Sequence, residues 1–148
     1  MICNQRTLLI PLIVCSFLIP TRLKAQANHC VAQESPKKMS IEAGQLVYTS
    51  KCLTCHQADG AGSPEMNPPL IKTKTVLGNK QPLIEGVIKG MNQHEESDGQ
   101  KYRNVMPGNP EMTDQEIANV LTYIRHGFGN KASAVKPSEV KAVRAAMK

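Results

Sequence analysis

Cys52, Cys55 and His56 have the spacing Cys-x-x-Cys-His, which is the pattern with the most specific chemistry in this sequence. Each thiol can add across one vinyl group of a porphyrin and form a thioether bond. The histidine beside the second thiol then lies under the iron and supplies a nitrogen ligand. The spacing therefore predicts covalent attachment of one c-type haem, with His56 as the proximal ligand.

Two other kinds of site use the same residue types. A redox-active Cys-x-x-Cys pair usually opens a helix after a buried strand, but the residues before Cys52 have the pattern of a helix. A structural zinc site needs four well-spread ligands, so Cys52, Cys55 and the adjacent His56 would still need a distant fourth. Both alternatives agree less well with the sequence than haem attachment does.

Met106 is the candidate for the second axial ligand. It lies in a Met-Pro-Gly sequence 50 residues after His56. A thioether favours ferrous iron, and His/Met ligation raises the reduction potential of a haem. Its rivals are Met66, Met91, Met112, His94 and His126. Met91 fits the apolar face of a helix, Met112 fits a hydrophobic staple at a helix entry, and we expect both histidines in solvent. We expect Met106 to bind the iron, and a histidine ligand or an open sixth position is the alternative.

A proline-rich loop, Asn67-Pro68-Pro69-Leu70, follows the haem-attachment motif. A rigid loop beside a ligating histidine can present a backbone carbonyl to the second ring nitrogen, which fixes the ring and raises its basicity. We expect Pro68 to supply this carbonyl and Leu70 to pack on the haem. An ordinary surface turn is the alternative interpretation.

Three amphipathic segments are expected to position these residues. The first begins with Ser40 as N-cap, presents Ile41, Gly44, Val47 and Tyr48 on one face, and runs into Cys52. The second begins near Pro82 and presents Leu83, Ile84, Val87, Ile88 and Met91. The third begins with a capping box at Thr113–Glu116 and presents Ile117, Val120, Leu121 and Ile124. Spacings of three and four residues predict helices in all three segments.

The remaining segments predict connections. Residues 72–80 have the pattern of a basic link, and Asp98-Gly99 predicts a hairpin turn, after which residues 100–105 extend towards Met106. A short helix is expected from Pro137, with Val140, Val143 and Met147 covering an edge of the core. Strand content is expected to be very low.

The first 27 residues have the pattern of a secretory signal. A basic residue precedes an apolar run that is too short to be a good membrane span, and an Ala-x-Ala sequence follows. Retention of this segment as an anchor is the alternative. Cleavage lowers the formal charge from +6 to +3 because three basic residues leave. We expect a periplasmic or otherwise exported protein with no membrane span after cleavage and no nucleic-acid partner. The expected parts are a flexible lead-in (28–39, containing an unassigned Cys30), a domain (40–130) and a basic tail (131–148).

The order of these features resembles that of the class I (mono-haem) cytochrome c family. The resemblance covers residues 40 to 130 and is carried by Gly44 and Tyr48, Cys52-x-x-Cys55-His56, Pro68-Pro69-Leu70, Met106-Pro107, and Leu121, Tyr123 and Ile124. Residues 102–107 and 113–130 resemble small bacterial cytochromes that serve periplasmic dehydrogenases or oxidases. The resemblance implies a mostly α fold, with three main helices around one haem and Gly44 at the crossing of the first and last helices, near Tyr123. The segment after the signal departs from the family in having no Trp, which leaves the groups that bind the haem propionates unassigned.

These features predict a carrier of single electrons rather than an enzyme acting on a substrate. The expected partners are redox proteins: a dehydrogenase or quinol oxidoreductase as donor and an oxidase or reductase as acceptor. Steering of acidic partners is expected from Lys72, Lys74, Lys80, Lys89, Lys101 and Arg103, although such a run of charges is also typical of a solvated face. A five-coordinate haem sensor or gas carrier, and an electron-transfer subunit of a dehydrogenase or reductase complex, are the alternatives.

Overall fold

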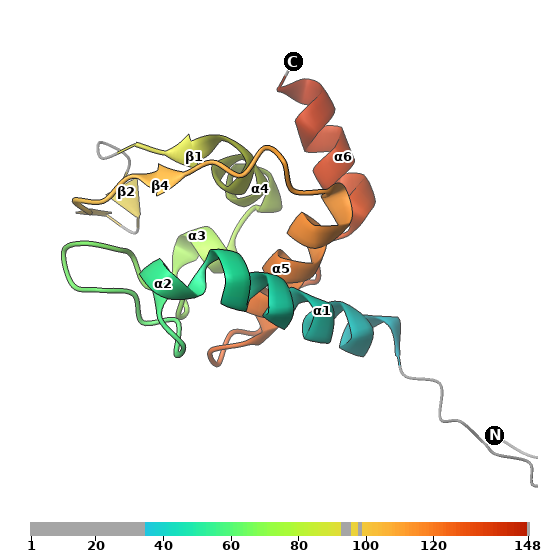
Figure 1. The fold of residues 1–148 in the computed structure, drawn as a ribbon, viewed down its shortest axis with the longest axis horizontal. Coiled ribbons are helices and arrows are strands. Elements are labelled where there is room, and N and C mark those ends of the chain that lie inside the picture. The colour runs from blue at the N-terminus through green and yellow to red at the C-terminus, as the bar shows by residue number, and fades with distance from the viewer. Residues whose placement is uncertain (1–34, 93–95, 98, 148) are drawn as a thin grey trace, which may run out of the picture. The chain divides into compact units, whose positions relative to one another are not determined.

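Helices α1 and α5 pack against each other more extensively than any other described pair of elements (Figure 1). The computed structural model describes residues 35–92, 96–97 and 99–147, which belong to one compact unit. The described part contains α1 (Pro36–Lys51), α2 (Leu53–His56), α3 (Lys74–Leu77), α4 (Lys80–Lys89), β1 (Gly90–Met91), β2 (Glu96–Ser97), β3 (Gln100–Lys101), β4 (Met106–Pro107), α5 (Asp114–His126) and α6 (Pro137–Ala146). The predicted mostly α fold is confirmed. The predicted signal segment, Cys30 and His94 lie outside the described residues.

Gly44 allows the close approach of α1 to α5. A Cβ atom at this position would lie 2.8 Å from the Cβ of Tyr123 and closer still to the backbone carbonyl of Asn119. The Ser40 hydroxyl donates a hydrogen bond to the Asn119 side chain across the same crossing, at 2.8 Å. The predicted contact between Gly44 and the Tyr123 region is therefore confirmed.

The predicted start of the first helix at Ser40 is wrong. The N-cap of α1 is Ser35, whose side chain accepts a hydrogen bond from the Lys38 amide, and Pro36 is the first helical residue. Proline favours the first turn because its φ angle is already helical and its missing N–H needs no partner there. Residues 36–39, expected to be part of a flexible lead-in, therefore belong to α1.

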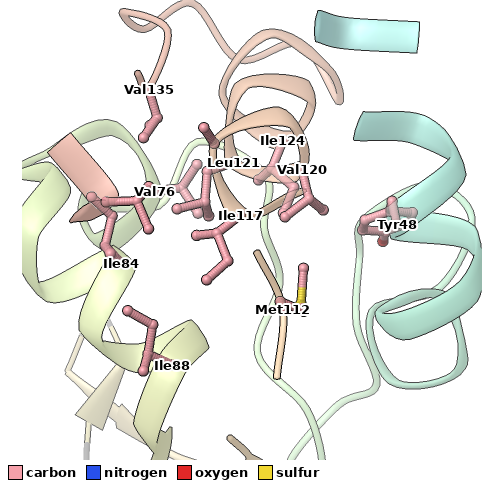
Figure 2. Packing of buried hydrophobic residues seen from close by; sticks show 12 residues of the cluster. Tyr48, Val76, Ile84, Ile88, Met112, Ile117, Val120, Leu121, Ile124 and Val135 are labelled. Carbon is pink, nitrogen blue, oxygen red and sulfur yellow. The ribbon is translucent and has the colours of Figure 1, made fainter. Parts of the chain in front are cut away.

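Helix α5 supplies most of the core. It begins with the predicted capping box, in which Thr113 and Glu116 bond reciprocally, and the four apolar residues predicted for its face are all buried. Figure 2 shows these side chains between Ile84 and Ile88 of α4 and Tyr48 of α1. Burial of this apolar surface is the main favourable contribution to holding the three helices together.

Helix α3 lies within residues 72–80, which were predicted as a basic link without a helix. The Thr73 side chain caps this single turn by accepting a hydrogen bond from the Val76 amide, and Val76 is 1% exposed. The buried Arg125 of α5 donates to the carbonyls of Val76 and Gly78. A four-residue helix with one buried apolar residue is too short to produce a periodic pattern.

Two short ribbons connect α4 to α5. Strands β2 and β3 pair antiparallel, with Ser97 opposite Gln100, as the predicted hairpin requires, while Asp98 itself lies outside the described residues. Strands β1 and β4 also pair antiparallel, with Gly90 opposite Pro107 and Met91 opposite Met106. The expectation that Met91 extends the α4 face is wrong, because Gly90 adopts a φ of +84° and ends the helix.

Helix α6 covers an edge of the core formed by α4 and α5 (Figure 1). Val140 is fully buried, while Val143 and Met147 are partly buried against the core, as predicted. Lys80 at the start of α4 forms an ion pair with Glu139 of α6 at 2.9 Å. The compact unit therefore extends past residue 130. Among the described helices, none combines the length and apolar character needed to cross a membrane.

Candidate functional site

All six residues predicted to bind a cofactor line one cavity of about 500 Å³. They are Cys52, Cys55, His56, Pro68, Leu70 and Met106. Apolar side chains of α4 and α5, including Leu83, Val87, Leu121 and Ile124, form much of the remaining wall. Three segments that are distant in the sequence therefore contribute to one mainly apolar space.

The single turn of α2 brings the two cysteines and the histidine together. Cys52 ends α1 and caps α2, and the His56 amide donates to the Cys52 carbonyl at 3.0 Å. The turn ends at Gln57, whose φ is +63°. The buried Tyr48 hydroxyl donates to the Gln57 carbonyl at 2.6 Å. This bond ties the end of α2 to the preceding helix.

His56 has the environment of a metal-ligating imidazole. Its Nδ1 lies 3.0 Å from the Pro68 carbonyl oxygen, the contact predicted from the proline-rich loop. Because a carbonyl only accepts hydrogen bonds, the proton lies on Nδ1, and Nε2 keeps a lone pair available for iron. Burial lowers the pKa of His56, and the bond to Pro68 partly opposes this effect. The neutral ring required of a ligand is therefore favoured at neutral pH.

The loop that carries Pro68 is held against α2 by backbone contacts. The Gly62 amide donates to the His56 carbonyl at 3.1 Å, and the Leu70 amide donates to the Gly60 carbonyl at 2.7 Å. Gly62 adopts a φ of +68°, and a Cβ there would overlap the backbone of Asn67 and Pro68. The carbonyl next to the imidazole is thus held by a packed loop and not by a free surface turn.

The two cysteines do not have the environment of a redox pair. Both are free, and burial together with the nearby Cys55 raises the pKa of Cys52 to about 11. Reactive dithiols instead have lowered pKa values. Within the described ranges, no three His, Cys, Asp or Glu side chains group so as to hold a metal ion. The dithiol and zinc alternatives therefore find no support in the geometry.

Met106 shares the cavity with two other methionines. Met91 lies directly opposite it in the ribbon, and residues paired in this way project to the same face. Met91 and the buried Met112 both line the cavity. The sulfur of Met91 lies 3.4 Å from the position that a Cβ on Gly86 would occupy, so this thioether packs against α4.

Met66 and His126 are not among the residues that line the cavity. His126 is half-buried rather than solvated as expected, and its Nδ1 donates to the Thr122 carbonyl of its own helix at 2.8 Å.

The ribbon that positions Met106 was not predicted. Gly90 lies so close to Met106 and Gly108 that a Cβ would overlap their backbone, and Gly108 lies equally close to the end of α4. The Asn109 amide also donates to the Val87 carbonyl at 2.9 Å. The signal in the sequence is the pair of glycines, one after α4 and one after Met106-Pro107, which permits close backbone contact.

Three aromatic side chains pack together near the end of α2. Tyr48, Tyr123 and Phe128 have ring centroids 5.3 to 5.6 Å apart, and Phe128 packs against Gly60. None of the three is among the residues that line the cavity. Aromatic packing therefore stabilises the junction of α1, α5 and the loop after α2.

The donor set of the cavity fits a covalently bound haem. Two thiols, an imidazole with an available nitrogen and a nearby thioether meet in a space bounded largely by aliphatic side chains. Haem c needs thiols for attachment and soft or imidazole axial ligands, and its macrocycle is stabilised by an apolar wall.

The comparisons with known proteins agree with this site. The cytochrome c family model matches residues 41–128. Cytochrome c-552 of Thermus thermophilus is 34% identical over 111 residues, which are 69% of this chain and 84% of that protein. The fructose dehydrogenase cytochrome subunit of Gluconobacter japonicus is 31% identical over 110 residues. The cytochrome c subunit of alcohol dehydrogenase (quinone) of Gluconobacter oxydans is 31% identical over 104 residues. Each of these two matches covers 69% of this chain but 22% of the relative.

Proposed function

Because this chain belongs to the cytochrome c family, which implies a covalently bound haem c, we propose that it is an exported carrier of single electrons with one haem. We further propose that His56 and Met106 are the axial ligands. A haem c bound here supplies reversible one-electron exchange at its iron. The observation that carries the proposal is the hydrogen bond from His56 Nδ1 to Pro68, inside the cavity that also contains Cys52, Cys55 and Met106.

Each residue of the site has a defined part in this proposal. Cys52 and Cys55 would hold the haem through two thioether bonds, each formed when a thiol adds its sulfur and its hydrogen across one vinyl group, so that no atom is lost. His56 supplies Nε2, and the Pro68 carbonyl orients the ring and raises its basicity. Leu70 and the aliphatic wall exclude water from the cofactor. Met106 supplies a soft sulfur that favours the ferrous state and raises the reduction potential.

We propose redox proteins as partners: a dehydrogenase or quinol oxidoreductase as donor and an oxidase or reductase as acceptor. Lys89 and Lys101 are exposed and suited to steering an acidic partner. Two residues of the proposed basic surface are already engaged, because Lys80 pairs with Glu139 and Arg103 pairs with Glu65. The steering surface is therefore smaller than the sequence implied.

A permanent subunit of a dehydrogenase complex is the second candidate. It is favoured by the two relatives whose names describe them as cytochrome subunits of dehydrogenases. Co-purification with a dehydrogenase at a fixed ratio would favour the subunit, and isolation as a monomer that exchanges electrons on collision would favour the carrier.

The proposed periplasmic location is supported by the signal pattern of residues 1–27.

Replacement of Met106 tests the proposed ligands. In Met106→Ala, both cysteines and His56 remain, so haem should be retained. The weak red absorption band of sulfur-ligated ferric iron should disappear. The reduction potential should fall by on the order of 100 mV, a fraction of the roughly 0.8 V range that axial ligands span.

Met91→Ala is the matched control because Met91 lies directly opposite Met106 in the ribbon. It should keep the red band and nearly the same potential. Loss of the band in Met91→Ala with retention in Met106→Ala would exchange the roles of the two methionines. A high-spin spectrum of the unmodified protein in both oxidation states would overturn the electron-carrier proposal.

A further inference from the structure

Helix α6 lies outside the segment that the family model matches, yet it contacts the loop that follows Met106. The match ends at residue 128, whereas α6 spans Pro137–Ala146. Val140 anchors the helix in the core, and Arg144 lies one turn further along. Helix α6 is therefore placed to affect Met106 through this loop.

Arg144 binds two backbone carbonyls of the loop between Met106 and α5, and the side chain of the first residue of α5. Its Nε donates to Asp114 Oδ1 at 3.0 Å, its Nη1 to the Pro110 carbonyl at 3.1 Å, and its Nη2 to the Met112 carbonyl at 2.7 Å. The side chains of Arg144 and Asp114 are 28% and 30% exposed. Hydrogen bonds from a charged donor are stronger than neutral ones, and partial burial reduces their screening.

The same loop is attached to α4 at its other end. The β1–β4 ribbon pairs Met91 with Met106, and the Asn109 amide donates to the Val87 carbonyl. Residues 110–113 then lead into α5, and Arg144 donates to the Pro110 and Met112 carbonyls within this stretch. The exposed ion pair between Lys51 and Glu111 also reaches this turn, but exposed pairs contribute little.

We propose that Arg144 is a positioning residue that holds the loop carrying Met106 in place, and so limits the release of this thioether from the iron. The inference rests on the proposed function. A thioether is a weak ligand, so its release rate depends on how easily its loop opens. Without the guanidinium, two backbone carbonyls lose their donor and Asp114 loses its partner, which favours the open loop. Lysine cannot replace the guanidinium group of Arg144, because an ammonium is a point charge and lacks the planar set of donors that reaches several acceptors at once.

The test uses the full-length haem-loaded protein and four variants: Arg144→Ala, Arg144→Lys, Lys141→Ala and Glu139→Gln. Lys141→Ala removes the same charge from an exposed position on the same helix. Glu139→Gln weakens the contact of α6 with α4 but leaves the three hydrogen bonds of Arg144 in place. Two quantities are measured: the rate at which carbon monoxide binds the ferrous protein, and the temperature at which the red sulfur band disappears relative to the loss of helical circular dichroism.

We expect Arg144→Ala to raise the carbon monoxide rate about tenfold or more, given the strength of charge-assisted hydrogen bonds. Its red band should disappear well below the temperature of global unfolding. Arg144→Lys should fall nearer to Arg144→Ala than to the unmodified protein. It also serves as the test if the alanine variant does not fold. Both control variants should remain within about twofold of the unmodified rate, because neither touches the loop.

Equal rates in Arg144→Ala and Lys141→Ala would overturn the inference, as would a red band that disappears only together with the helices. Equal effects of Glu139→Gln and Arg144→Ala would show that α6 acts only through overall stability, and would also overturn it. Met106→Ala is measured in parallel. If it keeps the red band, the proposed ligand fails; if it loses the band while Arg144→Ala behaves normally, only the role of Arg144 fails.

Discussion

At the scale of single residues, the candidate site depends on a few hydrogen bonds that fix atoms next to His56, the proposed iron ligand. The Pro68 carbonyl holds the His56 ring, and the Tyr48 hydroxyl holds the Gln57 carbonyl just after it. Burial raises the pKa of Tyr48 well above its usual value, with smaller contributions from nearby acidic groups. The phenol therefore stays neutral and remains a donor at any pH that the protein meets.

Tyr48→Phe tests the contribution of this hydroxyl to the stability of the haem-attachment turn. The ring packing remains, but the Gln57 carbonyl loses its donor, so the free energy of unfolding should fall by about 1 to 2 kcal/mol. Urea denaturation of the haem-loaded protein measures the change.

Tyr102→Phe is the control, because among the described residues its hydroxyl donates to the exposed Gln100 side chain. It should cost less than about 0.5 kcal/mol. Equal costs for the two variants would show that the Tyr48 bond contributes nothing beyond an ordinary surface contact.

Residue types and spacing predicted the local contacts of the candidate site. The Cys-x-x-Cys-His motif and the proline-rich loop lie within 20 residues of each other, and their predicted contact is present. The position of Met91 beside Met106 was not predictable from helical periodicity, since that periodicity continues past the point where Gly90 ends α4. The Arg144 contacts join residues about 30 positions apart and leave no local pattern.

At the scale of elements, the crossing of α1 and α5 sets the position of the haem-attachment turn. Helix α1 leads directly into Cys52, and α5 supplies the apolar wall of the cavity. Gly44 makes this crossing close enough for the Asn119 carbonyl to contact α1 directly. A shift of either helix therefore displaces the cysteines relative to the cavity wall.

Gly44→Ala tests this crossing. The new methyl group would overlap the backbone of α5, which cannot rotate away as a side chain can, so the helices must separate. We expect a loss of about 2 kcal/mol or more in the free energy of unfolding, although alanine is the better helix former.

Gly86→Ala is the matched control within α4. Its new methyl group would lie 3.4 Å from the flexible end of Met91, an ordinary contact. The gain in helix propensity, about 1 kcal/mol, should leave it neutral or more stable. Denaturant unfolding of both variants decides the matter, and a neutral Gly44→Ala would show that the crossing is looser than described.

Long helices were predictable because periodicity and caps agree over many residues, as in α5 with its Thr113 capping box. The early start of α1 is not evident from the sequence because Pro36 in a polar stretch is typical of a flexible segment as well as of the first turn after a Ser cap. Helix α3 and the β1–β4 ribbon are too short for a pattern. These two short elements are held by tertiary contacts instead. Examples are the contact of Arg125 with Val76 and that of Gly90 with Met106.

At the scale of the whole molecule, the cofactor cavity borders the core. Val120, Leu121 and Ile124 belong to the buried cluster and also line the cavity. The apolar wall of the site is therefore continuous with the interior that holds α4 and α5 together (Figure 2). Occupancy of the cavity and stability of the fold are coupled for this reason.

Removal of covalent attachment tests that coupling. Without a haem, the apolar walls of the cavity, about 500 Å³ in volume, lose their contacts on the side that the cofactor would fill. Domains of this size are only marginally stable, so we expect this loss of packing to unfold much of the chain. The double variant Cys52→Ser, Cys55→Ser should therefore lose both the haem and most of its helical circular dichroism. Met106→Ala, which keeps both attachment points, should retain its helices. A colourless double variant with native helix content would contradict the coupling, because the aliphatic core and the aromatic cluster of Tyr48, Tyr123 and Phe128 would then suffice to hold the fold.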